Sequence, residues 1–173
     1  MIELLVPVEK SLSKFYTENT PKLPKNFTKP LVEYLPWINL FIGAITLLAA
    51  FSLWGAATVT NSVINYSNNL GVSTTTNKLN AIVWIGLIVL FLEAALFIAS
   101  FSPTKNKKKS GWDLLFYAAV VNLIYGVVIA FSSLGGVFSL ILSIIGTAIG
   151  LYFLFQIRDY YVKSKSSEAP KSH

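Results

Sequence analysis

The most constraining feature of the sequence is an apolar run at residues 79–101 that contains a single carboxylic acid, Glu93. At a rise of 1.5 Å per residue, a helix of about 20 apolar residues crosses a hydrocarbon core of roughly 30 Å. An ionisable side chain near the middle of such a helix is costly, so it normally faces a partner or a cavity. The run therefore predicts a transmembrane helix, and Glu93 is the first candidate for a functional site.

The composition of the whole chain agrees with this prediction. Of its 173 residues, 54% are hydrophobic and only 13% are charged, whereas about 25% are charged in a typical soluble domain. Three more apolar runs lie at about residues 36–57, 112–132 and 137–156. We therefore expect an all-α membrane protein in which residues 35–158 form four transmembrane helices in an antiparallel bundle.

The segments outside these runs are more polar. Within residues 1–34, apolar side chains recur on one helical face, which predicts a cytoplasmic amphipathic helix. Prolines at positions 21, 24 and 30 then predict an extended connector, because proline removes a hydrogen-bond donor and biases the preceding residue away from helix. Residues 58–78 read as a polar loop, and residues 159–173 as a disordered cytoplasmic tail.

The basic residues predict the orientation. Thirteen of the fourteen lysines and arginines lie before the first run, between the second and third, or after the fourth, and only Lys78 lies elsewhere. By the positive-inside rule, both termini are cytoplasmic. The net charge of +6 is thereby explained without a nucleic-acid partner. Membrane lipids are the expected partners, and anionic head groups could contact the lysine cluster Lys105, Lys107, Lys108 and Lys109.

A polar layer is expected at the depth of Glu93. Counting from the centres of the runs places Asn122, Thr46 and Thr147 at about the same level, and Tyr125 shares a helix face with Asn122. The runs carry no lysine or arginine at this depth, so we expect a neutral carboxyl group that is hydrogen-bonded to its neighbours. Glu93 is then either a proton or cation site, or a hydrogen-bonding residue that orients the helices.

The fourth run carries small residues at four-residue spacing, which favours close contact between helices. They predict packing against a neighbouring helix of the same chain, or alternatively against a second copy. The residues in question are Ser139, Ser143, Gly146 and Gly150.

No pattern in the chain favours an enzyme. There is no cysteine, and the single histidine is the last residue, His173. No serine–histidine–aspartate set, metal-ligand spacing or phosphate-binding glycine loop is present, so we expect no catalytic residue, metal or cofactor. Asp113, three residues after Ser110, fits a capping box at the start of a helix.

Four short segments carry a resemblance to known proteins. Pro-Lys-Leu-Pro-Lys at Pro21, Leu-Pro-Trp at Leu35, Lys-Ser-Gly-Trp-Asp-Leu-Leu-Phe at Lys109 and Leu-Phe-Gln-Ile-Arg at Leu154 resemble segments of small four-span bacterial inner-membrane proteins that remain uncharacterised. The resemblance implies a bacterial inner membrane and no particular activity.

Two functions are therefore expected from the sequence. The first is a non-enzymatic scaffold or accessory protein that acts through helix faces and its basic surface, with a second copy or another membrane protein as its partner. The second is a small proton-coupled transporter or ion pathway that uses Glu93.

Overall fold

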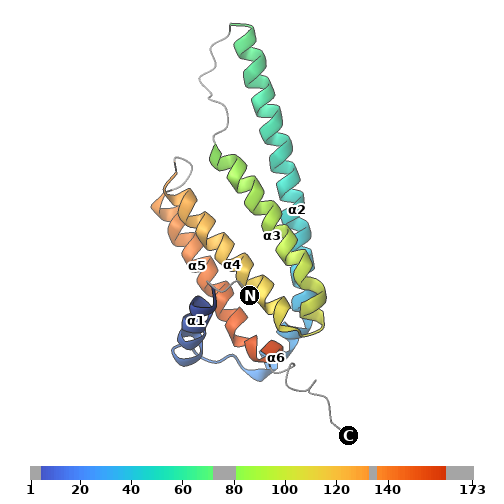
Figure 1. The fold of residues 1–173 in the computed structure, drawn as a ribbon, viewed down its shortest axis with the longest axis vertical. Helices are drawn as coiled ribbons and strands as arrows, with labels where there is room; N and C mark the ends of the chain where they lie inside the picture. Colours follow the sequence, from blue (N-terminus) through green and yellow to red (C-terminus); the bar gives the residue numbers. More distant parts are fainter. Residues whose placement is uncertain (1–4, 72–80, 133–135, 163–173) are drawn as a thin grey trace.

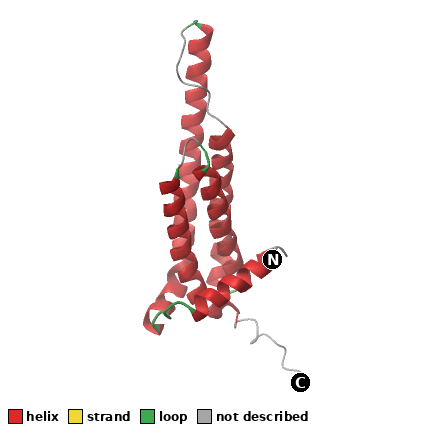
Figure 2. Ribbon diagram, turned by 90° about the vertical axis from the view of Figure 1, so that its left-hand side faces the viewer, coloured by secondary structure: helices red, strands yellow, loops and turns green. Residues whose placement is uncertain are grey.

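The computed structural model describes residues 5–71, 81–132 and 136–162, apart from the side chain of Ser139, and their regular elements are all helices (Figures 1 and 2). The all-α prediction is thus confirmed for this part of the chain. The helices are α1 Val6–Glu18, α2 Lys25–Asn69, α3 Ala81–Lys105, α4 Lys109–Ala130, α5 Val137–Gln156 and α6 Arg158–Val162.

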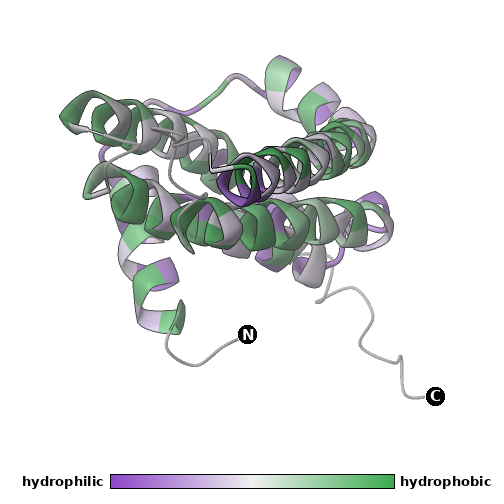
Figure 3. Ribbon diagram, turned by 90° about the horizontal axis from the view of Figure 1, so that it is seen from above, coloured by the Kyte–Doolittle hydropathy of each residue, from purple (hydrophilic) through white to green (hydrophobic). Residues whose placement is uncertain are grey.

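Three of these helices, α2, α3 and α4, are long and apolar enough to cross a membrane. Helix α5 contains a shorter apolar stretch, Leu140–Gln156. Seen from above, many turns of the long helices have the green of hydrophobic residues (Figure 3). The bounds of α5 coincide with the fourth predicted run, and α3 and α4 lie within a few residues of the second and third.

Helix α2 is much longer than predicted and corrects two expectations. It has 45 residues, which corresponds to about 68 Å. Residues 25–30, expected to belong to the extended connector, form its first turns, and residues 58–69, expected to be a loop, form its last turns. The rest of the predicted loop is outside the described residues, apart from Leu70 and Gly71. In Figure 1 the final part of α2 projects beyond the ends of α3, α4 and α5.

The prolines do not prevent the early start of α2. Pro24 precedes the helix with φ −57°, and its carbonyl accepts backbone hydrogen bonds from Phe27 at 2.9 Å and Thr28 at 3.1 Å. Pro30 lies inside the helix, where it removes one donor. Burial of Val32, which is 4% exposed in the core, offsets this loss. Packing therefore outweighs the local preference for an extended chain.

The connection between α3 and α4 also differs in detail from expectation. Pro103 does not end α3, which continues to Lys105. The residue before α4 is Lys108, and its side chain makes no capping hydrogen bond. The predicted capping box is therefore wrong. Asp113 instead accepts a hydrogen bond from Lys109 at 2.7 Å, one turn earlier on the same helix.

The long helices pack in chain order. Extensive interfaces join α2 to α3, α3 to α4 and α4 to α5, while α1 lies against α5. Helices α2 and α5 share no comparable interface, so the four helices do not close into a fully packed bundle. The helices nevertheless run antiparallel to their neighbours, as predicted (Figure 1).

The densest core lies where α1, α4, α5 and α6 meet. The Trp112 ring is fully buried, stacks on Phe116 at 5.4 Å and meets Phe155 edge-on at 5.3 Å. Its indole nitrogen donates a hydrogen bond to the Leu154 carbonyl at 2.8 Å. Tyr16 of α1 stacks on the same Phe155 ring at 5.3 Å. This aromatic cluster joins the N-terminal helix to the C-terminal half of the chain.

Polar contacts hold α1 in the same place. Glu9 is only 5% exposed, and its Oε1 accepts hydrogen bonds from Arg158 Nε at 3.1 Å and Nη2 at 2.6 Å. Its Oε2 lies 3.7 Å from Lys109 Nζ. The Tyr16 hydroxyl donates to the Ala148 carbonyl at 3.1 Å, and burial raises the pKa of Tyr16. The amphipathic helix is thus packed against the other helices along its buried face.

The connector after α1 is fixed by residues near the end of α5. The Gln156 side chain accepts a hydrogen bond from Leu23 N at 3.2 Å and donates to the Pro21 carbonyl at 3.3 Å. The Tyr152 hydroxyl donates to that carbonyl at 2.8 Å. The beginning of the predicted disordered tail, residues 159–162, belongs to α6 and contains the buried Tyr161. Residues 163–173 are outside the described part of the chain.

Candidate functional site

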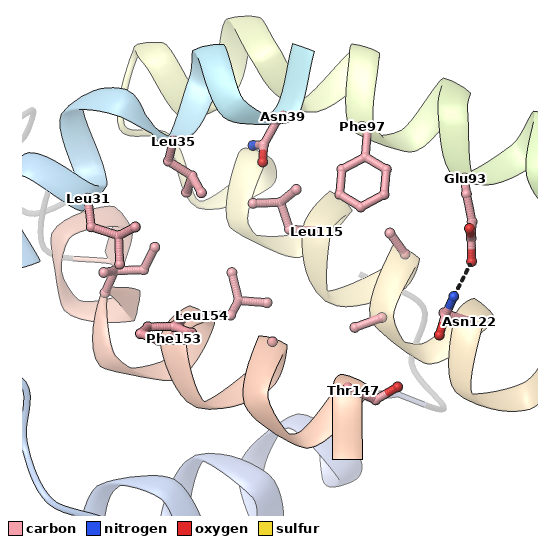
Figure 4. Close-up of a pocket in the computed structure, with 15 residues that line it drawn as sticks. Leu31, Leu35, Asn39, Glu93, Phe97, Leu115, Asn122, Thr147, Phe153 and Leu154 are labelled. Atoms are coloured by element: carbon pink, nitrogen blue, oxygen red, sulfur yellow. Dashed lines mark hydrogen bonds between the residues drawn. The ribbon is translucent and has the colours of Figure 1, made fainter. Parts of the chain in front are cut away.

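A cavity of about 270 Å³ lies among α2, α3, α4 and α5 (Figure 4). Its wall is mostly apolar, with leucine and phenylalanine side chains from all four helices. Each helix also contributes one side chain with a hydrogen-bonding group, namely Asn39 from α2, Glu93 from α3, Asn122 from α4 and Thr147 from α5. The space exists partly because the lining residues Ala118, Ala119, Gly146 and Gly150 are small.

Glu93 and Asn122 form a hydrogen-bonded pair across α3 and α4. Glu93 is 8% exposed, and Asn122 Nδ2 donates to its Oε1 at 3.1 Å. Asn122 itself is exposed. The structure therefore brings these two predicted residues together, with the amide oriented to donate to the carboxyl group (Figure 4).

The other predicted members of the polar layer have different surroundings. Thr147 lines the cavity, and its Oγ1 is buried without a hydrogen-bond partner among the described residues. Thr46 does not line the cavity, and its hydroxyl donates to the Ile42 carbonyl of its own helix at 2.9 Å. The Tyr125 hydroxyl lies against Gly86 of α3, where a Cβ atom would collide with it. Of the predicted residues, Glu93, Asn122 and Thr147 thus line one cavity.

Sequence reasoning did not identify Asn39, which is the most buried polar residue of the cavity. It is 2% exposed, and its Nδ2 has no hydrogen-bond partner in the described part of the chain. Its side chain extends from α2 toward the space above Leu115 in Figure 4. An amide within an apolar helix is itself a signal, because burying it without a partner is costly. The depth count missed Asn39 because it lies far from the centre of its run.

Asn39 and Glu93 lie at different levels of the cavity. A Cβ atom on Gly43 would meet Phe97 Cβ at 3.1 Å and Ile98 Cγ1 at 2.8 Å, which sets the register of α2 against α3. Because these helices are antiparallel, Asn39 is level with about residue 101, eight residues from Glu93. The separation along the helix axis is therefore about 12 Å. The cavity has hydrogen-bonding groups near both ends and apolar side chains between them.

The small residues of α5 do not form one continuous contact. Ser143 packs against Gly126 of α4, where a Cβ atom would collide with its hydroxyl. Gly146 and Gly150 line the cavity, and a Cβ atom on either would have no neighbour within 4 Å. The side chain of Ser139 is outside the described atoms. Part of the predicted packing stripe thus opens onto the cavity.

The four lysines that were predicted to contact lipid head groups have different surroundings in the structure. Lys105 lies over the Trp37 ring at 5.7 Å and, with Lys107 and Lys29, lines a second cavity of about 570 Å³. Lys109 is paired with Glu9 and Asp113 instead. Lys108 is exposed beside the start of α4.

Among the described residues, no group of three or more histidine, cysteine, aspartate or glutamate side chains lies close enough together to hold a metal ion. Comparison with protein-family models, curated proteins and solved structures found no match to this chain. The site is therefore interpreted from its own geometry.

Proposed function

We propose that this chain is a four-span membrane protein of non-enzymatic scaffold type, with both termini in the cytoplasm of a bacterial cell. Support for membrane insertion comes from the three long apolar helices and the apolar stretch of α5. Support for the orientation comes from the thirteen-to-one distribution of basic residues. The basic connection between α3 and α4 then lies at the inner face, and the projecting end of α2 lies outside.

The observation that carries the scaffold function is an apolar stripe on the projecting end of α2. Val59, Val63, Tyr66 and Leu70 are separated by four, three and four residues, and each is more than half exposed. This alternation is the spacing of a coiled-coil seam, so Val59, Val63 and Tyr66 lie on one face of α2, and the C-cap residue Leu70 continues the stripe. Ile64, which is buried, points to another side of α2. The stripe therefore faces away from the part of α2 that is covered.

The partner that fits this stripe is a second copy of the chain. Two copies inserted with the same orientation present parallel α2 helices, and parallel pairing places each stripe against an identical one. The stripe covers only two heptads, which would be weak for free helices in water. When both copies are anchored in one membrane, the effective concentration of the two stripes is higher. The membrane also holds the two α2 helices in the same orientation before they meet.

Disulfide crosslinking tests this pairing without background, because the chain has no cysteine. We expect Val63→Cys to form a crosslinked dimer in oxidised membranes. Asn68→Cys is the matched control, since Asn68 is exposed on the opposite face of the same helix end. In mild detergent, Val63→Asp should convert the dimer to a monomer by placing a charge in the seam. A wild-type protein that is monomeric in membranes, or equal crosslinking of both cysteine variants, would exclude the proposal.

A second candidate function is a proton or ion pathway organised on Glu93. The cavity that reaches Glu93 favours it, because a carboxyl group beside an internal space can exchange a proton with molecules entering that space. The test is proton flux in liposomes. Glu93→Gln should abolish the flux, and Glu18→Gln, at an exposed position of α1, should retain it. Absence of flux in the wild type would eliminate this function.

A further inference from the structure

The feature that carries a further inference is the side-chain amide of Asn39 in the cavity wall, which has no hydrogen-bond partner within residues 5–71, 81–132 and 136–162. A buried donor without an acceptor is rare in folded proteins, because desolvating the donor costs free energy that a hydrogen bond normally returns. Here the side chain is 2% exposed and Nδ2 has no partner among the described residues. The amide therefore has an open hydrogen-bonding position directed at the cavity.

Water alone fits this position poorly. A buried water normally makes two to four hydrogen bonds. In Figure 4 the labelled cavity residues drawn around Asn39 are Leu35, Leu115 and Phe97, which offer no polar side-chain atom. The carboxyl and hydroxyl groups of the cavity lie about 12 Å away along the axis, at the level of Glu93. A water bound to the Asn39 amide would thus have that amide as its one side-chain partner, which is fewer than the two to four hydrogen bonds that a buried water normally makes.

The shape of the cavity favours a larger apolar molecule. Its volume of about 270 Å³ exceeds the roughly 150 Å³ of an engineered apolar cavity that binds benzene. Gly146 and Gly150 leave their part of the α5 wall without side chains, and α2 and α5 share far less contact than neighbouring helices do, although the Phe27 and Phe153 ring centroids lie 6.3 Å apart. A molecule dissolved among apolar chains can therefore reach the space between these two helices.

We propose that the cavity binds a neutral, membrane-soluble molecule with an apolar body and a carbonyl-type oxygen, which accepts a hydrogen bond from Asn39 Nδ2. The apolar body lies along the leucine and phenylalanine side chains toward Glu93. Thr147 Oγ1, which is also unpartnered in the described chain, can bond a second polar group at the inner end of the ligand. This binding is independent of the proposed pairing of two copies, because the stripe of α2 lies outside the cavity.

The probe for the test is methyl octyl ketone with an isotope-labelled carbonyl, added to the full-length protein in lipid nanodiscs. A hydrogen bond to the carbonyl lowers its infrared stretching frequency, so bound ketone gives a band distinct from ketone in lipid. We expect a saturable shifted band in the wild type. Asn39→Leu should remove the band and weaken ketone binding about tenfold. Asn26→Leu, at an exposed position of the same helix, should leave both unchanged.

A second pair of variants tests the location without touching Asn39. Gly150→Leu places a side chain in open space within the cavity and should prevent binding, whereas Gly55→Leu, at an equally open position of α2, should not. The Val63→Asp monomer should still bind the ketone, which separates this result from the outcome for dimerisation. The proposal is overturned if n-decane binds as tightly as the ketone, or if Asn39→Leu retains the shifted band. It is equally overturned if only an alkylammonium probe binds and Glu93→Gln abolishes that binding.

Discussion

The attachment of α1 to the other helices is predicted to depend on Glu9. This carboxylate is 5% exposed and contacts Arg158 at 2.6 Å and Lys109 at 3.7 Å. Removing one member of a fully buried ion pair costs about 3–5 kcal/mol, whereas exposed pairs contribute about 0–1 kcal/mol. The side chains of Arg158 and Lys109 are 27% and 30% exposed, so solvent screens them partly. We therefore expect Glu9→Gln to weaken the docking of α1 by about 1–2 kcal/mol.

Hydrogen exchange measures this effect locally. A loss of 1–2 kcal/mol corresponds to roughly 5- to 30-fold faster exchange of the protected amides of α1, provided that they exchange by undocking of this helix. The amides of α3 and α4 should keep their protection. Glu18→Gln is the control, because Glu18 is exposed on the same helix. The reasoning is refuted if the two variants exchange alike, or if Glu9→Gln accelerates exchange throughout the chain.

Two further substitutions have expected effects on stability. Tyr161 is 1% exposed, its hydroxyl has no hydrogen-bond partner among the described residues, and burial raises its pKa to about 12 from 10.0. The Tyr161 hydroxyl therefore loses its proton at lower pH in the unfolded chain than in the folded chain. The protonated hydroxyl contributes its full share of the free energy of unfolding below pH 10, and this share is lost as the pH rises toward 12. Tyr161→Phe should lack this part of the pH dependence in unfolding experiments. An identical decline in both proteins would contradict the assignment. Gly111→Ala should destabilise the fold by about 1–3 kcal/mol, because its Cβ would lie 2.5 Å from Thr104 N. Gly55→Ala should not destabilise the fold, because Gly55 has open space around it. Equal unfolding midpoints for the two alanine variants would refute the prediction for Gly111.

Much of the helical arrangement could be predicted from the sequence. The apolar runs are long and are separated by turns or charged residues, so the bounds of α5 were predicted correctly and those of α3 and α4 nearly so. The ends of α2 could not be predicted in the same way. Local preferences favoured an extended connector and a polar loop, whereas the early turns of α2 depend on packing of Val32 against residues distant in sequence.

The candidate site was predicted in part for a related reason. Glu93 and Asn122 are conspicuous in apolar helices, and counting residues from the centres of the runs placed them at one depth. The same count could not show that the Thr46 hydroxyl bonds to its own helix. It could not show either that Asn39 faces the cavity, because the face that a helix turns inward depends on the register between helices.

The central claim is that the projecting end of α2 and the connection between α3 and α4 lie on opposite sides of a membrane. Single cysteines introduced at Asn68 and at Asn106 test this most directly, because the chain has no cysteine of its own. With a membrane-impermeant maleimide, we predict that Asn68→Cys is labelled in intact spheroplasts. Asn106→Cys should be labelled only after the membrane is permeabilised. Labelling of both positions from the same side, or the reverse pattern, would contradict the account.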